Sequence, residues 1–376
     1  KTSHNLIISS HLFPSSEELD ELMAIVNLPL PDQKELKNLI KKIAINTNSN
    51  LEEQDLNELS IASSGLTEIK VKQVTAKALA QRGKISKEDI KDILEEKKQV
   101  IARSEILEFF EAKSSQDDIG GLNVLKVWLN QRYRAFSKEA RDYGLPIPKG
   151  VLLVGAQGTG KSLTAKSISK SWSMPLLRLD VGRLFSSLVG SSEARTREAI
   201  LRAEAMSPCI LWIDEIDKGF GGDARSDGGT SQRVLASLLT WMAEKESAVF
   251  VIATANAIDK LPAELLRKGR FDEIFFLDLP NSEERLSILD LHLKKRRPSY
   301  SFPLSTIIDR TDGFSGAELE QAVIEGMHIS FSENRELMEK DLIKAVSELV
   351  PLSRTAKEQI DFLKEWSSTG RARSAS

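Results

Sequence analysis

The chain has 376 residues, of which 41% are hydrophobic and 28% are charged, and its formal net charge at pH 7 is −3. This length and composition predict a globular protein of two or three domains, and the mixed charge gives no general attraction to nucleic acid or anionic lipid. The one cysteine, Cys209, excludes an intrachain disulfide, and its apolar run "CILWI" predicts a buried strand residue rather than a nucleophile. Four scattered histidines offer no cluster of metal ligands.

No stretch approaches the roughly 20 apolar residues that a membrane span needs, and the first ten residues lack the pattern of a signal peptide. We therefore expect a soluble compartment such as the cytoplasm, and no membrane partner. Because the first residue is Lys1 rather than Met, we also expect a piece or a processed product of a longer protein.

Residues 1–100 have a mainly helical pattern, and "LIISS" at residues 6–10 is the one short strand candidate. The charged run that follows predicts exposed helices that lead into a linker, "SSQDDIGG". We expect a linker helix over residues 101–117, with a domain boundary near Ser115.

Residues 118–280 alternate short apolar runs with amphipathic helical segments. The runs are "VLLV" at 151–154, "LLRLDV" at 176–181, "CILWID" at 209–214, "VFVIATA" at 249–255 and "EIFFLDL" at 273–279. Such alternation predicts an α/β core, a parallel sheet sandwiched by helices. After Pro280 the strands stop, and the pattern predicts a helical lid over residues 281–365 and a flexible tail over residues 366–376.

A faint internal repeat links the two halves of the chain. "ASSGLTEIKVKQVTAKAL" parallels "TDGFSGAELEQAVIEGM", and "SKEDIKDIL" parallels "MEKDLIKAV". We infer that residues 1–100 are the last strands and helical lid of a degenerate second copy; the alternative is that helical segments of like period resemble one another. The copy at residues 1–100 has no phosphate-binding loop, so we do not expect it to hydrolyse a nucleotide.

The segment "GAQGTGKS" fits the pattern G-x-x-x-x-G-K-S between a predicted strand and a predicted helix. Glycines allow the backbone N–H groups to wrap a triphosphate, the helix directs its positive end at the phosphates, and the lysine reaches their oxygens. We call residues 155–162 the phosphate loop. Its residues are Gly155, Ala156, Gln157, Gly158, Thr159, Gly160, Lys161 and Ser162, and Leu163 follows in the helix.

Three polar side chains follow two other strands of the predicted sheet. Asp214 and Glu215 come after "CILWI", and Asn256 comes after "VFVIATA". In α/β sheets the carboxyl ends of the strands bind ligands. We expect Asp214 and Ser162 to hold Mg²⁺, Glu215 to polarise the attacking water, and Asn256 to position that water.

"LLRKGRFD" places Arg267 and Arg270 just beyond this strand. Either the two form a solvated basic loop, or their guanidinium groups reach the γ-phosphate of a neighbouring subunit.

Together these segments, with "DDIGGLNVLKVWL" before them and "GFSGAELEQA" after them, resemble the AAA ATPases in order and approximate spacing over residues 118 to about 350. The amino-acid sequence of these motifs resembles most the ycf46-type AAA proteins of cyanobacteria and algal plastids. That resemblance implies ATP and Mg²⁺ as cofactors, a homo-oligomeric ring, usually a hexamer, and the plastid stroma as location if the gene is plastid-encoded.

The resemblance also implies residue roles. Asn256 would be the γ-phosphate sensor, and Arg267 with Arg270 would act as arginine fingers on the adjacent subunit. The remaining nucleotide contacts that it implies are Ile119 and Gly120 at the adenine, His292 at the sugar or base, and Gly316 and Ala317 in the lid. For His292 a partly buried helix residue is the alternative.

The sequence departs from the family pattern at the loop that grips a threaded polypeptide. Leu188 stands where threading relatives have an aromatic residue, and Ser191 where they have an acidic one; Phe185 is a possible substitute. Gln157 replaces a frequent proline, which we expect to be harmless because the loop binds through its backbone.

We therefore predict an ATPase that couples turnover between subunits to the remodelling of a protein partner. A nucleotide-gated scaffold with low turnover is the alternative. A nucleic-acid motor is a third, less favoured because neither a basic stripe nor stacking aromatic residues stand out.

Overall fold

The structure is a computed structural model that describes residues 30–101, 106–110, 119–185, 191–220 and 230–376. The strand candidate at residues 6–10, the boundary at Ser115 and the loop residue Leu188 lie outside these ranges.

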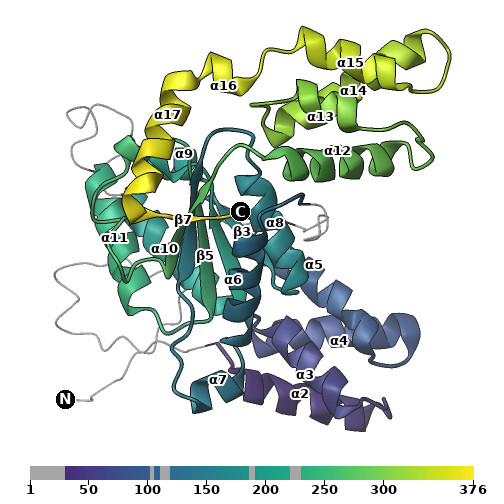
Figure 1. Cartoon of the computed structure of the whole chain (residues 1–376). Coiled ribbons are helices and arrows are strands. Elements are labelled where there is room, and N and C mark those ends of the chain that lie inside the picture. Colours follow the sequence, from purple (N-terminus) through teal and green to yellow (C-terminus); the bar gives the residue numbers. More distant parts are fainter. Residues whose placement is uncertain (1–29, 102–105, 111–118, 186–190, 221–229) are drawn as a thin grey trace, which may run out of the picture.

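A seven-stranded sheet forms the centre of the described chain, in the order β1-β3-β4-β5-β2-β6-β7 (Figure 1). The inner five strands are parallel and are the five predicted from the sequence, which confirms the α/β fold class. The strands are β1 Leu107–Phe110, β2 Gly150–Gly155, β3 Leu176–Leu179, β4 Cys209–Ile213, β5 Val249–Ala255, β6 Glu273–Leu277 and β7 Arg373–Ser374.

Both faces of the sheet are covered by helices. Because side chains alternate along a strand, Leu152 and Val154 of β2 enter one apolar cluster while Val151 and Leu153 enter the other. Burial on both faces explains why the strands have continuous apolar sequences. The covering helices are α6 Asn123–Arg134, α7 Lys138–Asp142, α8 Lys161–Ser171, α9 Val181–Phe185, α10 Ser191–Ala205 and α11 Thr230–Glu244, with the short turns η3 Ile216–Phe220 and η4 Ile258–Lys260.

We predicted a linker helix over residues 101–117, but residues 107–110 within this range form the strand β1. This strand pairs antiparallel with β3. Leu107 and Phe109 contact one apolar cluster of the core, and Phe110 contacts the other, where its ring meets the edge of Trp212 at a centroid distance of 5.5 Å. The charged residues nearby suggested a helix, but the free edge of β3 offers both hydrogen bonds and apolar surface to a strand.

The predicted flexible tail over residues 366–376 is also corrected. The chain continues from α17 (Lys357–Trp366) through the turn η5 (Ser367–Arg371) into β7, which pairs parallel with β6. Ala375 is buried, its N–H donates to the carbonyl of Phe276 at 3.0 Å, and its own carbonyl accepts from Leu125 N at 3.1 Å. The strands therefore do not stop at Pro280.

The lid is shorter than the predicted residues 281–365. Leu363 and Trp366 of α17 belong to the core of the sheet, whereas the preceding helices share an apolar cluster of their own, which includes Leu289, Leu319 and Leu342. We use "lid" for these four helices: α12 Ser282–Arg296, α13 Ser305–Arg310, α14 Gly316–Ser332 and α15 Glu339–Glu348. The short helix α16 (Leu352–Thr355) joins the lid to α17.

Residues 30–101 form a second helical unit, which we call the N-terminal unit. It has its own apolar cluster, which includes Leu36, Leu59, Val71 and Ile93, and it lies at the opposite end of the sheet from the lid (Figure 1). Its elements are α2 Gln33–Asn46, α3 Glu53–Ser63, α4 Glu68–Arg82, η1 Lys87–Asp89 and α5 Ile90–Ile101. None of the described helices combines the length and apolar composition that a bilayer crossing requires.

Candidate functional site

The phosphate loop joins β2 to the first turn of α8. Gly158 and Gly160 have φ angles of +80° and +92°, in the left-handed region that glycine adopts without strain. A Cβ on Gly158 would lie 2.9 Å from Ser315 Oγ, so the loop closely approaches the start of α14 in the lid. The backbone is therefore shaped as an anion-binding turn at a helix N-terminus.

Lys161 is the first residue of α8, and its side chain folds back along the loop. Its ammonium group donates to the carbonyl oxygens of Gly155 at 2.8 Å and Ala156 at 2.6 Å. Burial lowers the pKa of Lys161 to about 8, and the negative charges of Asp217 and Asp214 oppose that decrease. A buried cation thus lies beside the N–H groups of the loop.

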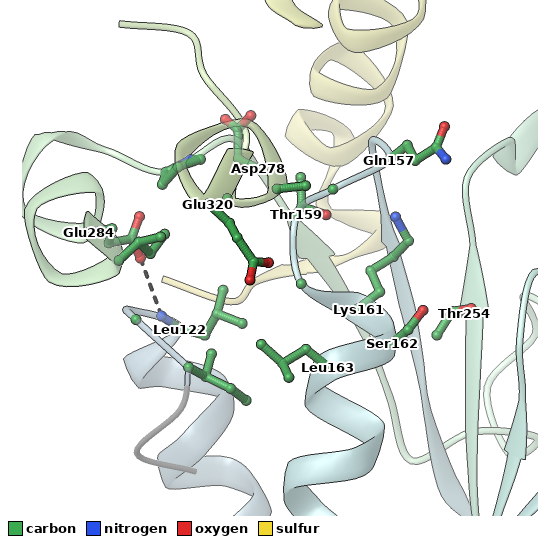
Figure 2. A pocket seen from close by; sticks show the side chains of 18 of the residues that line it. Leu122, Gln157, Thr159, Lys161, Ser162, Leu163, Thr254, Asp278, Glu284 and Glu320 are labelled. Atoms are coloured by element: carbon green, nitrogen blue, oxygen red, sulfur yellow. Dashed lines mark hydrogen bonds between the residues drawn. The ribbon is translucent and has the colours of Figure 1, made fainter. Parts of the chain in front are cut away.

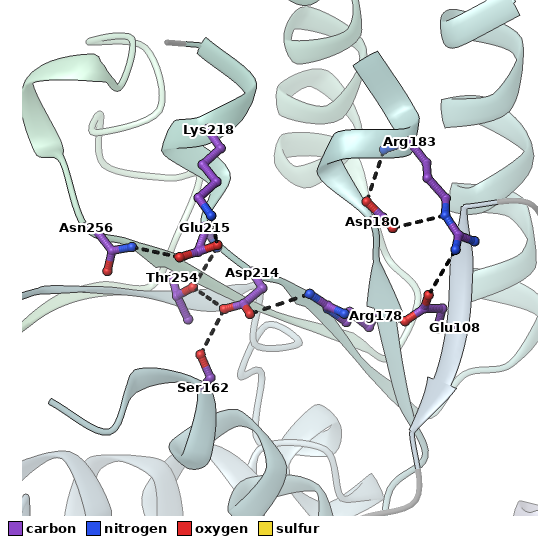
Figure 3. Close-up of polar contacts among 10 residues, drawn as sticks. All are labelled: Glu108, Ser162, Arg178, Asp180, Arg183, Asp214, Glu215, Lys218, Thr254 and Asn256. Carbon is purple, nitrogen blue, oxygen red and sulfur yellow. Dashed lines mark hydrogen bonds and ion pairs between the residues drawn. The ribbon is translucent and has the colours of Figure 1, made fainter. Parts of the chain in front are cut away.

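Asp214 follows β4 and meets the loop from the neighbouring part of the sheet (Figure 3). Its Oδ1 accepts from Ser162 Oγ at 3.0 Å and from Thr254 Oγ1 at 2.7 Å. Its Oδ2 lies 3.8 Å from Arg178 Nη2 of β3. A hydroxyl and a carboxylate in contact are the oxygen ligands that Mg²⁺ prefers.

Glu215 has a φ angle of +50°, an unusual backbone conformation for a residue other than glycine. Its N–H donates to Thr254 Oγ1 at 2.9 Å, which helps to hold this conformation. Its Oε1 accepts from Asn256 Nδ2 at 3.1 Å, and its Oε2 forms an ion pair with Lys218 Nζ at 2.5 Å. The two carboxylates that follow β4 are therefore held by different partners.

Asp214 and Glu215 line two pockets, the main pocket described below and a second one of about 490 Å³. The second pocket is also lined by Arg178 and Lys218. Arg178 also lies 3.5 Å from Glu108 of β1, so it links the edge strand to the carboxylate of Asp214 (Figure 3).

The main pocket, with a cavity volume of about 320 Å³, lies between the phosphate loop and the lid (Figure 2). The end at the phosphate loop is polar, and the lid end combines apolar side chains with three carboxylates and a histidine. Its lining residues are Ile119, Gly120, Leu122, Gln157, Gly158, Thr159, Gly160, Lys161, Ser162, Leu163, Asp214, Glu215, Thr254, Asn256, Asp278, Pro280, Glu284, Ile288, Leu291, His292, Gly316, Ala317 and Glu320.

The chain is similar to known proteins over its whole length. Residues 151–279 match the AAA family, the ATPase family associated with various cellular activities, and residues 34–104 match the second domain of SpoVK-like AAA ATPases. The AAA domain-containing protein ycf46 of Pyropia yezoensis is 48% identical over 380 residues, which cover 100% of this chain and 77% of that relative. The ycf46 protein of Guillardia theta is 49% identical over 95% of this chain and 71% of its own length.

The chain belongs to the ycf46-type AAA ATPases. The resemblance that the sequence indicated is thereby confirmed, and with it an ATP-binding protein. A more distant relative of this AAA protein, the ATP-dependent zinc metalloprotease FtsH of Cyanidium caldarium, is 36% identical over 243 residues, 62% of this chain and 39% of that protein.

In this AAA protein most of the predicted site residues lie together in the main pocket. Gly155 and Ala156 do not line it, and instead give their carbonyl oxygens to Lys161. Arg267 and Arg270 are also absent from the lining: the side chain of Arg267 is exposed, and Arg270 Nη1 donates to the carbonyl of Leu239 at 2.8 Å.

His292 lies on α12 at the lid wall of the pocket, with 14% of its side chain exposed. Burial lowers its pKa, although the charge of Glu320, whose Oε1 is 3.5 Å from Nδ1, opposes this decrease. His292 is therefore a partly buried helix residue in the wall of the pocket, and its contact with a sugar or base stays a prediction.

Sequence reasoning missed several lining residues. Thr254 stands two residues before Asn256 in the strand that was predicted to end at the site, so its hydroxyl could have been noticed. Asp278 and Pro280 follow the carboxyl end of β6, a position that the sequence pattern could also have indicated. The others come from the approach of the lid or of the segment before α6, which no local pattern indicates; they are Leu122, Glu284, Ile288, Leu291 and Glu320.

The loop that corresponds to the polypeptide-gripping loop of threading relatives lies mostly outside the described residues. Leu188 is among the residues that the structure does not describe. Phe185 ends α9 and Ser191 begins α10.

Proposed function

We propose that this protein hydrolyses ATP to ADP and phosphate in a magnesium-dependent reaction, and that it uses the energy to remodel a protein partner. The observation that carries the proposal is the contact of Ser162 Oγ with Asp214 Oδ1 at 3.0 Å, in the pocket that also holds Lys161, Glu215 and Asn256. The AAA family match supports nucleotide binding independently of this geometry.

Magnesium fits the residues present. Ser162 and Asp214 supply a hydroxyl and a carboxylate, and Mg²⁺ usually takes one or two such protein ligands and completes its shell with phosphate and water. In the described part of the chain no group of three or more His, Cys, Asp or Glu side chains could hold a metal alone. When bound, the ion would neutralise charge on the phosphate oxygens.

The residues of the pocket would then divide the reaction between them. Lys161 and the N–H groups of the loop bind the phosphate oxygens, and Asn256 orients the attacking water. Glu215 accepts a proton from that water as its oxygen bonds to the γ-phosphorus. The bond between the γ-phosphorus and the oxygen shared with the β-phosphate breaks, and its electron pair leaves with ADP.

Arg267 and Arg270 would complete the site of a neighbouring copy. They do not line the pocket of their own chain, and the exposed position of Arg267 leaves it accessible to a neighbour. A guanidinium group delivered in this way stabilises the charge that develops in the transition state. This role requires an oligomer, and AAA family members commonly form rings.

A second candidate function is a nucleotide-gated scaffold with low turnover. One observation favours it: the carboxylate of Glu215 is paired with Lys218, at 2.5 Å, as well as with Asn256. While both carboxylate oxygens of Glu215 are engaged in this way, neither is free to meet a water, so turnover would require this pair to open.

A steady-state ATPase assay on mixed variants tests the proposal. We expect Glu215→Gln and Arg267→Ala each to lower turnover at least about 100-fold, as removal of a catalytic or charge-stabilising group does. When the two variants are mixed, sites with an intact Glu215 can receive an intact Arg267 from a neighbour, so turnover should partly return.

Lys268→Ala is the matched control, because Lys268 is an exposed cation adjacent to Arg267, and its turnover should equal that of the unchanged protein. Turnover that survives Glu215→Gln would refute the site assignment. Magnesium-dependent ATP affinity with negligible turnover in the unchanged protein would favour the scaffold, and absent recovery in the mixture would refute the shared site.

A further inference from the structure

Glu320 lies on α14 of the lid and reaches into the main pocket. Ala317, in the first turn of α14, donates its N–H to the carbonyl of Gly158 at 3.2 Å, which fixes the start of the helix against the phosphate loop. One helical turn advances about 5 Å, so Glu320 lies one turn beyond that contact. In Figure 2 its carboxylate projects between Leu122 on one side and Thr159 on the other.

Arg296 of α12 holds this carboxylate in place, and His292 of the same helix lies beside it. Arg296 Nη2 donates to Glu320 Oε1 at 2.5 Å, and His292 Nδ1 lies 3.5 Å from the same oxygen. Arg296 Nη1 is 3.1 Å from His292 Nδ1, so the three side chains form one cluster. Within the described part of the chain the contacts of the carboxylate all reach Oε1, which leaves Oε2 available to a ligand.

The two other carboxylates at the lid end of the pocket are engaged differently. Glu284 accepts from Leu122 N at 3.3 Å with Oε1 and from Asn281 N at 3.0 Å with Oε2, so it holds protein backbone with both oxygens. Asp278 Oδ2 is 3.4 Å from Lys364 Nζ of α17. Glu320 is therefore the carboxylate at this end that is best placed to recognise a ligand.

Chemistry limits what Glu320 can recognise. A carboxylate accepts hydrogen bonds, so it pairs with hydroxyl or amino groups and repels phosphates. The triphosphate belongs at the loop around Lys161, and a flat base fits the apolar wall that Ile119 and Ile288 help to form. The sugar joins these two parts of a nucleotide, and Glu320 lies between their two positions.

We propose that Glu320 accepts a hydrogen bond from a ribose hydroxyl and makes the site selective for ribonucleotides over deoxyribonucleotides. The inference rests on the proposed ATP site and deepens it. Carboxylates recognise ribose hydroxyls in the same way in dinucleotide-binding folds. Arg296 is a positioning residue for this contact, because it binds Oε1 and leaves Oε2 to the ligand.

Calorimetric titration tests the inference with the unchanged protein and four nucleotides: ATP, 2′-deoxyATP, 3′-deoxyATP and inosine triphosphate. We expect at least one of the two deoxy analogues to bind about 10- to 100-fold more weakly than ATP, the range for losing a hydrogen bond to a charged group. Inosine triphosphate keeps both hydroxyls but lacks the amino group of adenine, so it reports on the base instead of the sugar.

Glu320→Gln should bring the affinities for ATP and for the discriminated deoxy analogue to within about threefold of each other, since an amide makes a weaker, uncharged hydrogen bond. Glu325→Gln is the matched control: it removes the same charge from the same helix outside the pocket, and should keep the full discrimination. Arg296→Ala should lower the discrimination without abolishing ATP binding.

Equal affinity of the unchanged protein for ATP and both deoxy analogues would overturn the inference while leaving the proposed function intact. Discrimination that persists in Glu320→Gln would overturn it as well, and so would a variant that loses only the preference for ATP over inosine triphosphate. Absence of any affinity for ATP would instead overturn the proposed function, and this inference with it.

Discussion

The lid and the N-terminal unit begin in the same way. In the N-terminal unit Asp32 caps α2 by accepting from Glu35 N at 2.7 Å, and Glu35 accepts in return from Asp32 N at 2.9 Å. In the lid Asn281 and Glu284 form the same reciprocal pair at the start of α12, with both distances 3.0 Å. A capping box of this kind satisfies two helix N–H groups and fixes where the helix starts.

Their longest helices are introduced by the same turn. Gly65 and Gly313 have φ angles of +85° and +76°, and each stands two residues before an N-cap, Thr67 in the N-terminal unit and Ser315 in the lid. The residue between glycine and cap is a buried apolar one in both units. The backbone thus turns in the same sense before α4 and α14.

Both units also contain a buried aspartate paired with an arginine seven or six residues earlier. Asp89 is paired with Arg82, and its Oδ2 accepts from Ser86 N at 2.9 Å. Asp341 is paired with Arg335 at 2.6 Å, and its Oδ2 accepts from Met338 N at 2.9 Å. The internal repeat suggested by the sequence therefore extends to capping and ion pairing, and the match of residues 34–104 to a second domain of AAA ATPases supports it.

The units differ where the lid faces the main pocket. Counted from their N-caps, Glu68 and Ile69 of α4 stand where α14 has Gly316 and Ala317. A Cβ on Gly316 would lie 3.3 Å from the carbonyl oxygen of Gly158, so only a small residue allows this approach to the loop. The lesson is that two helical units can share capping, turns and ion pairs and still differ in the first turn that contacts a phosphate loop.

The exchange of this first turn is expected to have the largest effect. The double variant Gly316→Glu with Ala317→Ile gives the lid the first turn of α4, which should crowd the carbonyl of Gly158 and weaken ATP affinity more than about 100-fold. Lid stability should hold, because glutamate favours the first turn of a helix. Calorimetry measures the affinity, and the reverse exchange, Glu68→Gly with Ile69→Ala, should leave it unchanged. Equal ATP affinities in the unchanged protein and in both exchange variants would show that the first turn does not distinguish the two units.

Removal of the two buried aspartates separates stability from binding. Asp341→Ala and Asp89→Ala should each destabilise their own unit by about 2 kcal/mol, the scale of a lost hydrogen bond to a charged group. Hydrogen exchange resolved along the chain measures each loss. Only Asp341→Ala should also weaken ATP affinity, since α15 packs in the lid and the N-terminal unit lies away from the pocket. Weaker binding by Asp89→Ala would show that the N-terminal unit contributes to the site.

The two turn glycines offer a narrower comparison, which concerns stability alone. Gly65→Ala and Gly313→Ala each place a side chain in left-handed backbone, at a cost of about 1 kcal/mol. A Cβ on Gly65 would also meet the backbone carbonyl of Ala205 at 2.1 Å, whereas a Cβ on Gly313 would meet the more adaptable side chain of Ser353. Gly65→Ala should therefore lower the unfolding temperature more. An equal decrease, measured by thermal unfolding, would mean that α10 moves away without a penalty.

The inner five strands could be predicted because burial on both faces gives each a continuous apolar run. The edge strands could not. Leu107 to Phe110 is short and flanked by charges, and Arg373 and Ser374 carry no strand pattern; each pairs because an existing strand offers unpaired N–H and C=O groups. The amphipathic pattern of α17 was visible, but not that its apolar side contacts the sheet instead of the lid.

The sequence alone determined the phosphate loop, the carboxylates after β4 and the amide after β5, because parallel strands bring their carboxyl ends to one edge. The tertiary structure decided that Thr254 connects Asp214 to Glu215 and that Glu320 enters the pocket. Local periodicity encodes which elements form and which residues end them. It carries no information on how far the lid leans over the sheet, which depends on contacts between residues more than a hundred positions apart.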